Sequence, residues 1–142
     1  MDARLLKFFE EGIAFNRLLG MKLERVEAGK ASIRVPFRDE LVGDPFRPAL
    51  HGGVLSALAD TAGGLAVWAQ LGSMDARVST VDLRVDYYAP AALRDVIADA
   101  EVVRLGNRVG VARITLHHGD PAHVVAEGKG VYNIRAPSRR TD

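Results

Sequence analysis

Apolar residues near the N-terminus of the chain recur at the spacing of a helix. The positions that follow this spacing are Leu5, Leu6, Phe8, Phe9, Ile13, Phe15, Leu18 and Leu19. They predict a packed amphipathic helix over residues 3–19, with Gly20 as its C-terminal stop. Over residues 21–37, apolar residues sit beside charged neighbours on either side of Ala28-Gly29-Lys30, which predicts a β-hairpin.

The longest helix is predicted over residues 52–71. It follows a predicted loop, residues 38–50, in which Pro45 and Pro48 withhold backbone donors and bias the preceding residues towards extended conformations. Residues 51–71 hold no proline and are rich in leucine and alanine, and Gly72 offers a stop. The apolar residues fall on more than one face, so we expect protein to surround this helix.

The second half of the chain alternates between apolar and polar residues. In residues 80–87 the odd positions, from Val81 to Tyr87, should face one side of a strand, and the even positions, from Thr80 to Asp86, the other. Further strands are predicted at 95–105, 108–118 and 122–134, separated by turn sequences. Only the tail, residues 136–142, looks unstructured.

This order of elements predicts an α+β fold in which a curled antiparallel sheet wraps around a long central helix. The chain has 142 residues, of which 48% are hydrophobic, so a single domain spanning residues 1–142 can bury a core. The 19 basic residues nearly cancel the 18 acidic ones, which argues against a large face for nucleic acid. The absence of cysteine excludes disulfides, thiolate metal sites and a cysteine nucleophile.

The N-terminal residues mix charges of both signs among apolar ones, unlike the continuous apolar stretch of a secretory signal. No window of the sequence looks apolar enough to span a bilayer. We therefore expect a soluble cytoplasmic protein.

Two features of the predicted central helix point to chemistry. Gly52 and Gly53 stand at its start, where first-turn N–H groups lack intrahelical partners, and without Cβ atoms they let a ligand approach closely. Such a terminus favours developing negative charge. Asp60 lies within an otherwise apolar stretch, where an ionised carboxylate is costly unless it is hydrogen-bonded, paired or functional. Either feature alone also has a structural explanation, as a turn or as a solvent-facing residue.

Together the two features match the needs of acyl transfer, which are an oxyanion-stabilising terminus and a general base or nucleophile. Eight residues of helix place Gly52 and Asp60 roughly 12 Å apart along one axis. One chain cannot easily bring both to a single carbonyl, so we infer a site shared between two protomers.

Four segments of the sequence together resemble a known family. They are His51-Gly52-Gly53, Leu58-Ala59-Asp60-Thr61-Ala62, Ser79-Thr80-Val81-Asp82-Leu83 and Tyr88-Ala89-Pro90-Ala91. They are similar to the hotdog-fold acyl-CoA thioesterases of the phenylacetate-degradation type, and the resemblance spans roughly residues 20–134. It implies hydrolysis of a small, medium-chain or aromatic acyl-CoA, with no cofactor besides the coenzyme A of the substrate.

The resemblance also implies roles for individual residues. The N–H of Gly52 would polarise the thioester carbonyl, the Asp60 carboxylate would activate water or attack directly, and the Thr80 hydroxyl would help to place the water or the carboxylate. The glycine would come from one subunit and the other two residues from its neighbour, in a homodimer that often pairs into a tetramer. We expect His51 and Gly53 to position the substrate.

This chain departs from the family at the loop before the first glycine. The family commonly has an asparagine or glutamine six or seven residues upstream, where this chain offers Asp44, Pro45 and Phe46. The usual contribution of that amide near the reacting thioester must come from water or from another residue.

Other functional interpretations remain open or are disfavoured. Ser56 has no histidine at helical spacing, which argues against a serine hydrolase, and His117, His118 and His123 lie around a turn in an arrangement unsuited to a metal. The fold could instead serve a non-catalytic acyl-CoA binding protein. It could also serve an enoyl-thioester hydratase or dehydratase, for which His51 is the one histidine near Asp60 in sequence.

Overall fold

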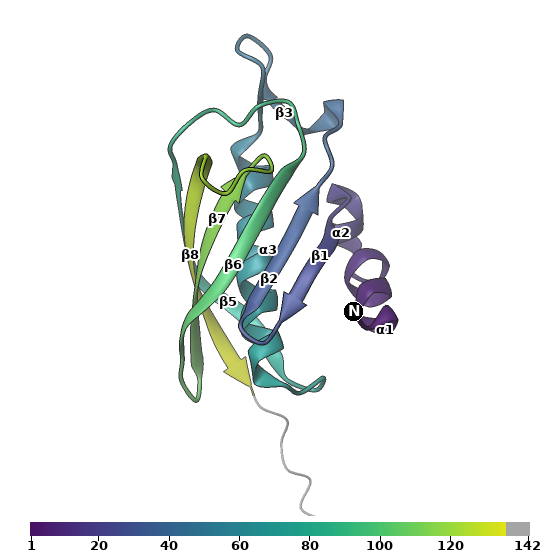
Figure 1. The fold of residues 1–142 in the computed structure, drawn as a ribbon, viewed down its shortest axis with the longest axis vertical. Coiled ribbons are helices and arrows are strands. Elements are labelled where there is room, and N and C mark those ends of the chain that lie inside the picture. Colours follow the sequence, from purple (N-terminus) through teal and green to yellow (C-terminus); the bar gives the residue numbers. More distant parts are fainter. Residues whose placement is uncertain (136–142) are drawn as a thin grey trace, which may run out of the picture.

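The computed structural model describes residues 1–135, so the predicted tail at 136–142 lies outside the described residues. A long helix, α3 (Gly52–Leu71), packs in the concave side of a six-stranded antiparallel sheet (Figure 1). The strands are β1 (Lys22–Glu27), β2 (Lys30–Val35), β5 (Arg77–Tyr87), β6 (Val96–Leu105), β7 (Val109–His117) and β8 (Val124–Arg135). Their order across the sheet is β1-β2-β6-β7-β8-β5. This arrangement confirms the predicted hotdog fold.

The core lies between α3 and the sheet. Apolar residues of α3 such as Leu58, Ala62 and Val67 are fully buried, but its other side is only half-buried, so the prediction that protein surrounds this helix holds for its sheet-facing side alone. Glycines in the strands allow a close approach: a Cβ at Gly110 would lie 2.7 Å from the Val67 side chain. Van der Waals packing against the sheet therefore fixes the position of the helix.

The same helix corrects one expectation from the sequence. Helix α3 contains an 18-residue window that is long and apolar enough to cross a membrane, although we expected no such window. Half of that window is buried inside the fold, so the apolar residues are used by the core.

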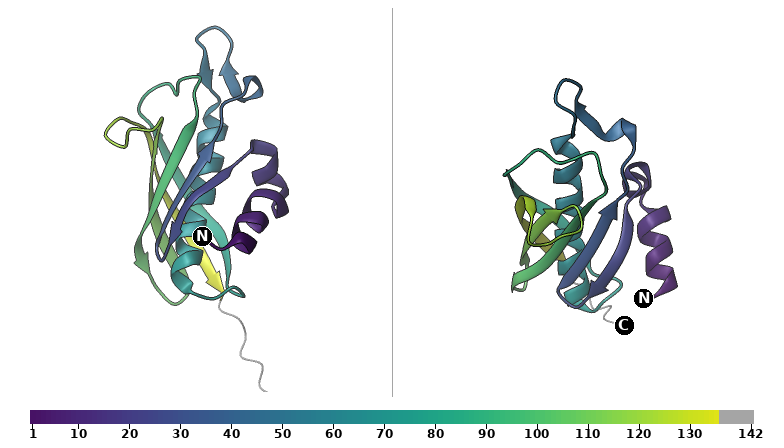
Figure 2. Two further views of the ribbon diagram at one scale, coloured as in Figure 1. Left: turned by 45° about the vertical axis from the view of Figure 1, so that its right-hand side comes forward. Right: turned by 45° about the horizontal axis from the view of Figure 1, so that its top comes forward.

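The N-terminal segment differs from the single helix predicted over residues 3–19. It consists of α1 (Ala3–Lys7), a π-helical turn η1 (Phe8–Gly12) and α2 (Ala14–Leu19), with an extended residue, Ile13, before α2. The buried Asn16 amide donates to the Phe9 carbonyl at 3.0 Å, so a side chain replaces a helical N–H at the break. Gly20, with φ of 70°, ends α2 as predicted. The segment flanks β1, as both views in Figure 2 show.

The predicted loop at 38–50 contains regular structure. A 3-10 turn, η2 (Asp39–Leu41), leads into a small hairpin of β3 (Val42–Asp44) and β4 (Ala49–Leu50). Pro45 and Pro48 lie in the connection between the two strands, where no ladder hydrogen bond is needed, so they do not prevent pairing. The hairpin projects beyond the end of the sheet (Figure 2).

Strand β5 carries a β-bulge that changes which residues face the helix. Thr80 pairs with Tyr132 and Asp82 with Val131, so Val81 is an extra residue in the strand. The predicted alternation therefore breaks at this point: Thr80 bonds to α3 and Val85 packs on the core, while Val81 is 64% exposed. The expectation that Thr80 and Val85 face opposite sides is wrong, because one inserted residue reverses the phase of the strand.

The break in the N-terminal segment generates a first prediction. Replacing Asn16 with alanine leaves the Phe9 carbonyl without its buried partner, so the free energy of unfolding should fall by about 1–3 kcal/mol in a urea titration. The control is Arg17→Ala, which removes an exposed bond from Arg17 to the Glu11 carbonyl and should change stability by less than about 0.5 kcal/mol. Equal losses in the two variants would contradict a stabilising role for the buried amide.

Candidate active site

Asp60 and Thr80 meet where α3 crosses the start of β5. The Thr80 hydroxyl donates to the Asp60 carboxylate at 2.7 Å. Asp60 is half-buried, and Thr80 is exposed in the single chain. Two of the residues predicted from the sequence are therefore brought together, and the bulge at Val81 is what turns Thr80 towards the helix. The carboxylate keeps a second oxygen for a water or a substrate.

Tyr132 on β8 contacts the main chain at Asp60, and the sequence analysis did not predict this residue. Its hydroxyl donates to the main-chain carbonyl of Asp60 at 2.9 Å, and only 1% of the residue is exposed. Burial, and then the negative charge of Asp60, raise the pKa of Tyr132, so the hydroxyl keeps its proton. This bond fixes the position of Asp60 relative to strand β8.

Three glycines make room for the Tyr132 side chain. A Cβ at Gly63 or Gly130 would overlap the tyrosine hydroxyl, and one at Gly64 would lie 3.3 Å from the ring. A glycine in a helix interior costs about 1 kcal/mol relative to alanine, so a pair of them calls for a packing reason. The Gly63-Gly64 pair inside the predicted helix is thus the sequence signal that could have located this contact.

The N-terminus of α3 leaves one N–H group open. The His51 ring accepts from the Gly53 N–H through Nδ1 at 2.8 Å, and the His51 carbonyl accepts from the Val54 N–H. Within residues 1–135, the N–H of Gly52 makes no hydrogen bond. His51 therefore acts as an N-cap, Gly53 is occupied by that cap, and Gly52 alone offers its donor to a ligand.

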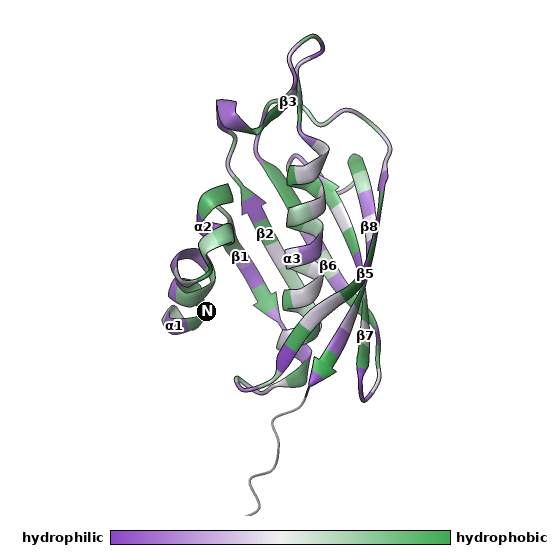
Figure 3. Cartoon of the chain, turned by 180° about the vertical axis from the view of Figure 1, so that it is seen from behind, coloured by the Kyte–Doolittle hydropathy of each residue, from purple (hydrophilic) through white to green (hydrophobic). Residues whose placement is uncertain are grey.

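Tyr87 holds this end of the helix against β5. Its hydroxyl donates to the Gly52 carbonyl at 3.0 Å and lies in contact with the Ser56 hydroxyl. Gly52 and Tyr87 line a pocket of about 340 Å³, whereas Asp60 and Thr80 line a different pocket of about 750 Å³. A single chain therefore carries the two predicted halves of the site at separate places along α3, whose backbone lies between β5 and the N-terminal segment in Figure 3.

Asp44, Pro45 and Phe46, which stand where the family commonly has a loop asparagine or glutamine, belong to a turn. The Asp44 carboxylate accepts from the N–H groups of Phe46 and Arg47 at 2.9 and 3.0 Å, and these bonds, Arg47 first, lower the pKa of Asp44. Phe46 is 93% exposed at the tip of the β3–β4 hairpin. Asp44 thus stabilises the hairpin connection in this structure.

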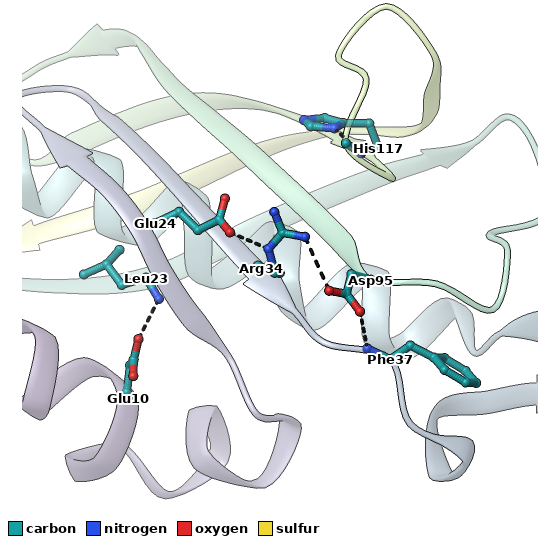
Figure 4. A network of polar contacts seen from close by, with 8 residues as sticks. Glu10, Leu23, Glu24, Arg34, Phe37, Asp95 and His117 are labelled. Carbon is teal, nitrogen blue, oxygen red and sulfur yellow. Dashed lines mark hydrogen bonds and ion pairs between the residues drawn. The ribbon is translucent and has the colours of Figure 1, made fainter.

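The other histidines have structural partners. His117 is buried and lies 2.6 Å from an Asp99 carboxylate oxygen, while His118 bridges the Asp95 carbonyl and the Ala92 N–H. Asp95 also joins the strand network of Glu24, Arg34 and Phe37 (Figure 4). Among residues 1–135 no three histidine, aspartate or glutamate side chains gather in a group able to hold a metal ion. Arg84 pairs with the exposed Asp86.

Comparisons with known proteins show which family the chain belongs to. The family model described as Thioesterase superfamily matches residues 48–125, which include Gly52, Asp60 and Thr80. A relative from Halobacterium salinarum is 36% identical over 140 residues, covering 93% of this chain and 91% of the relative. The medium/long-chain acyl-CoA thioesterase YigI of Escherichia coli is 33% identical over 132 residues, covering 84% of this chain and 85% of YigI.

Solved structures point the same way. A crystal structure of a Shewanella oneidensis protein related to the thioesterase superfamily superposes with a TM-score of 0.82 and is 29% identical. The match covers 93% of this chain and 94% of that chain. From the fold, the matched range and the identity to these relatives, the chain belongs to the thioesterase superfamily.

Proposed function

We propose that this chain is a homodimeric acyl-CoA thioesterase in which Asp60 is the catalytic carboxylate. The observation that carries the proposal is the hydrogen bond from Thr80 to Asp60 at the wall of a pocket of about 750 Å³. A carboxylate held by a hydroxyl beside an apolar pocket can direct water, or itself, at an acyl carbonyl. The name and the 33% identity of YigI support coenzyme A thioesters as the substrate class.

The reaction follows from these groups. The thioester carbonyl accepts a hydrogen bond from the Gly52 N–H, which stabilises the oxyanion that forms when a nucleophile attacks. With Asp60 as base, it takes a proton from water as the water oxygen bonds to the carbonyl carbon. The tetrahedral intermediate then breaks its C–S bond and expels the thiolate of coenzyme A, which takes the proton from Asp60, so the products are the acid and coenzyme A. With Asp60 as nucleophile, its oxygen bonds to the carbonyl carbon and the thiolate leaves, and water then hydrolyses the resulting acyl-enzyme anhydride. The two routes need the same residues.

The pairing of two chains explains how Gly52 reaches Asp60. Helix α3 and strand β5 run in opposite directions, so Asp60 lies beside Thr80 while Gly52 lies beside Tyr87. Strand β5 is an edge strand of the sheet. If it pairs antiparallel with β5 of a second copy about a two-fold axis near Leu83, Thr80 comes opposite the partner's Tyr87. Asp60 then approaches the partner's Gly52.

Exposure along β5 supports this pairing. Val81 is 64% exposed and Tyr87 is 51% exposed in the single chain, and the Asp60–Thr80 bond itself faces solvent. A partner would cover these residues and exclude water from the carboxylate, which strengthens its electrostatic interactions. A cytoplasmic location, no cofactor beyond the coenzyme A of the substrate, and pairing of dimers into tetramers belong to the same proposal.

The two other functions on this fold predict different products. A binding protein would retain acyl-CoA unchanged, and a hydratase would add water across the double bond of an enoyl-CoA without releasing a thiol. The capping role of His51 disfavours the hydratase, since its Nδ1 is engaged with Gly53. Thiol release from a saturated acyl-CoA distinguishes the thioesterase from both.

The role of Asp60 is tested by Asp60→Asn, which keeps the shape and can still accept from Thr80. We expect kcat to fall by about two to four orders of magnitude, the usual contribution of a general base, with KM nearly unchanged. Asp75→Asn, at an exposed carboxylate in the turn before β5, is the control and should keep wild-type kcat. Wild-type thiol release from Asp60→Asn would reject the assignment.

The role of the Thr80 hydroxyl is tested by Thr80→Val, which keeps the branched shape. Loss of one hydrogen bond to a carboxylate should lower kcat about tenfold, and Thr80→Ser should restore it. Urea titrations of both variants report stability. A change in stability with unchanged kcat would show that the hydroxyl serves folding alone.

The oxyanion role of Gly52 can be tested with little change to the helix. Gly52→Pro removes the N–H and adds a ring that the helix tolerates, because proline is favoured at the first helical position and the preceding residue, His51, is already extended with ψ of 131°. We expect kcat to fall about 10²–10³-fold. Gly52→Ala adds a Cβ at 3.4 Å from the Tyr87 ring but keeps the N–H, so it should retain most activity.

Mixing Gly52→Pro with Asp60→Asn then tests the shared site. Random subunit exchange gives about half heterodimers, each with one intact site of two, so activity should return to about a quarter of wild type. Differently tagged variants establish that exchange has occurred. Exchanged mixtures that stay as inactive as their parents would place Gly52 and Asp60 in separate reactions.

A further inference from the structure

The pocket beside Asp60 extends away from the carboxylate along α3. On the helix, Thr61, Gly64, Leu65 and Trp68 follow Asp60 at intervals that keep them on one side. The N-terminal segment forms the facing wall, and the start of β5 forms the third side. Apart from Asp60, the charged residues that line it are Arg77 and Arg135, exposed residues paired across the ends of β5 and β8. The pocket therefore leads from a polar end at Asp60 along an apolar passage.

Hydrogen bonds hold the N-terminal segment, which forms one wall of this pocket, in place. Glu10 accepts from the Leu23 N–H at 3.0 Å, which attaches the segment to β1 (Figure 4). The π-helical turn is closed by a bond from the Ile13 N–H to the Phe8 carbonyl at 3.2 Å. Gly12 lets the Phe8 ring lie across the turn, since a Cβ there would be 3.2 Å from that ring. π-helical turns occur frequently at functional sites.

Apolar side chains of this wall are exposed although they line the pocket. Phe8 is 61% exposed and Ile13 is 36% exposed, while the neighbouring Phe9 is buried in the core. The half-buried Trp68 faces the same space from α3. Contiguous apolar surface of this kind is expected to have an apolar occupant. Because the passage is continuous with Asp60 and Thr80, the occupant should be covalently joined to the group that reacts there.

We propose that this passage is the acyl subsite and that Phe8, Ile13 and Trp68 select straight, apolar acyl chains of about eight to ten carbons. The inference rests on the proposed thioesterase function. From Asp60 to Trp68 the helix rises about 12 Å, and an extended chain of ~1.5 Å bonds advances about 1.3 Å per carbon, so about nine carbons fit before Trp68. The thioester carbonyl lies at Asp60 and the methyl end of the acyl chain lies at Trp68.

The test compares kcat/KM for saturated acyl-CoAs from four to sixteen carbons. In the wild-type protein each added methylene should raise kcat/KM by up to about fourfold, until a maximum near eight to ten carbons. Phe8→Ala should flatten this rise, and Trp68→Ala should move the maximum to longer chains by opening the far end. Both variants should lose least with butyryl-CoA, whose short chain makes the fewest apolar contacts, and circular dichroism with urea titration shows that they fold.

The matched control is Phe15→Ala, an exposed aromatic residue of the same segment that does not line the pocket. It should leave the whole chain-length profile unchanged. A wild-type profile without a maximum, an equal loss for all chain lengths in Phe8→Ala, or a preference for acyl chains ending in a carboxylate, which would point to Arg77 and Arg135, would overturn the subsite. Absence of thiol release from every acyl-CoA would instead overturn the proposed function.

Discussion

Two tyrosine hydroxyls from the sheet donate to main-chain carbonyls of α3, and these two contacts organise the molecule. Tyr87 donates to the carbonyl of Gly52, and the buried Tyr132 donates to that of Asp60. These carbonyls belong to the two residues expected to act on the substrate. The strands therefore fix the translation and rotation of the helix at the points where its chemistry is placed.

These contacts also determine which residues the neighbouring positions of the sheet and helix can hold. A buried tyrosine needs volume beside α3, and the glycines at 63, 64 and 130 provide it at a cost in helix and strand propensity. The carboxylate of Asp60 needs a donor, and β5 supplies Thr80 through one inserted residue at Val81. Residues without reactive groups are in this way as necessary to the site as those that touch the substrate.

Much of this fold could be predicted from periodicity, because α3 and the long strands each repeat one pattern over many residues. Gly20 was identified as a helix stop, and it adopts the left-handed conformation that glycine favours. The break at Ile13 could not be predicted, since it depends on a buried side chain, Asn16, that competes with the helical ladder. The β3–β4 hairpin is not predicted, because prolines disfavour strand interiors and the sequence does not show that Pro45 and Pro48 lie in the turn between two short strands.

The candidate site was partly visible in the sequence. Asp60 is conspicuous as a charge in an apolar helix, and the role of Thr80 comes from family resemblance, since alternation along β5 places that side chain opposite the face of Val85. Tyr132 is not predicted, because its contact spans 72 residues and the Gly63-Gly64 pair marks only the helix side of it. The placement of the partner's Gly52 opposite Asp60 stays a prediction.

The bulge in β5 also bears on how the protein behaves at high concentration. An edge strand presents unpaired N–H and C=O groups, which recruit strands of unrelated chains and can seed fibres. In β5 the regular row of backbone groups is interrupted at Val81, and the charged side chains of Asp82, Arg84 and Asp86 follow along the strand. Strands of unrelated chains that approach this edge therefore meet a broken ladder and charged side chains, both of which disfavour pairing. The residue that aims Thr80 at the helix thus also protects the edge against aggregation.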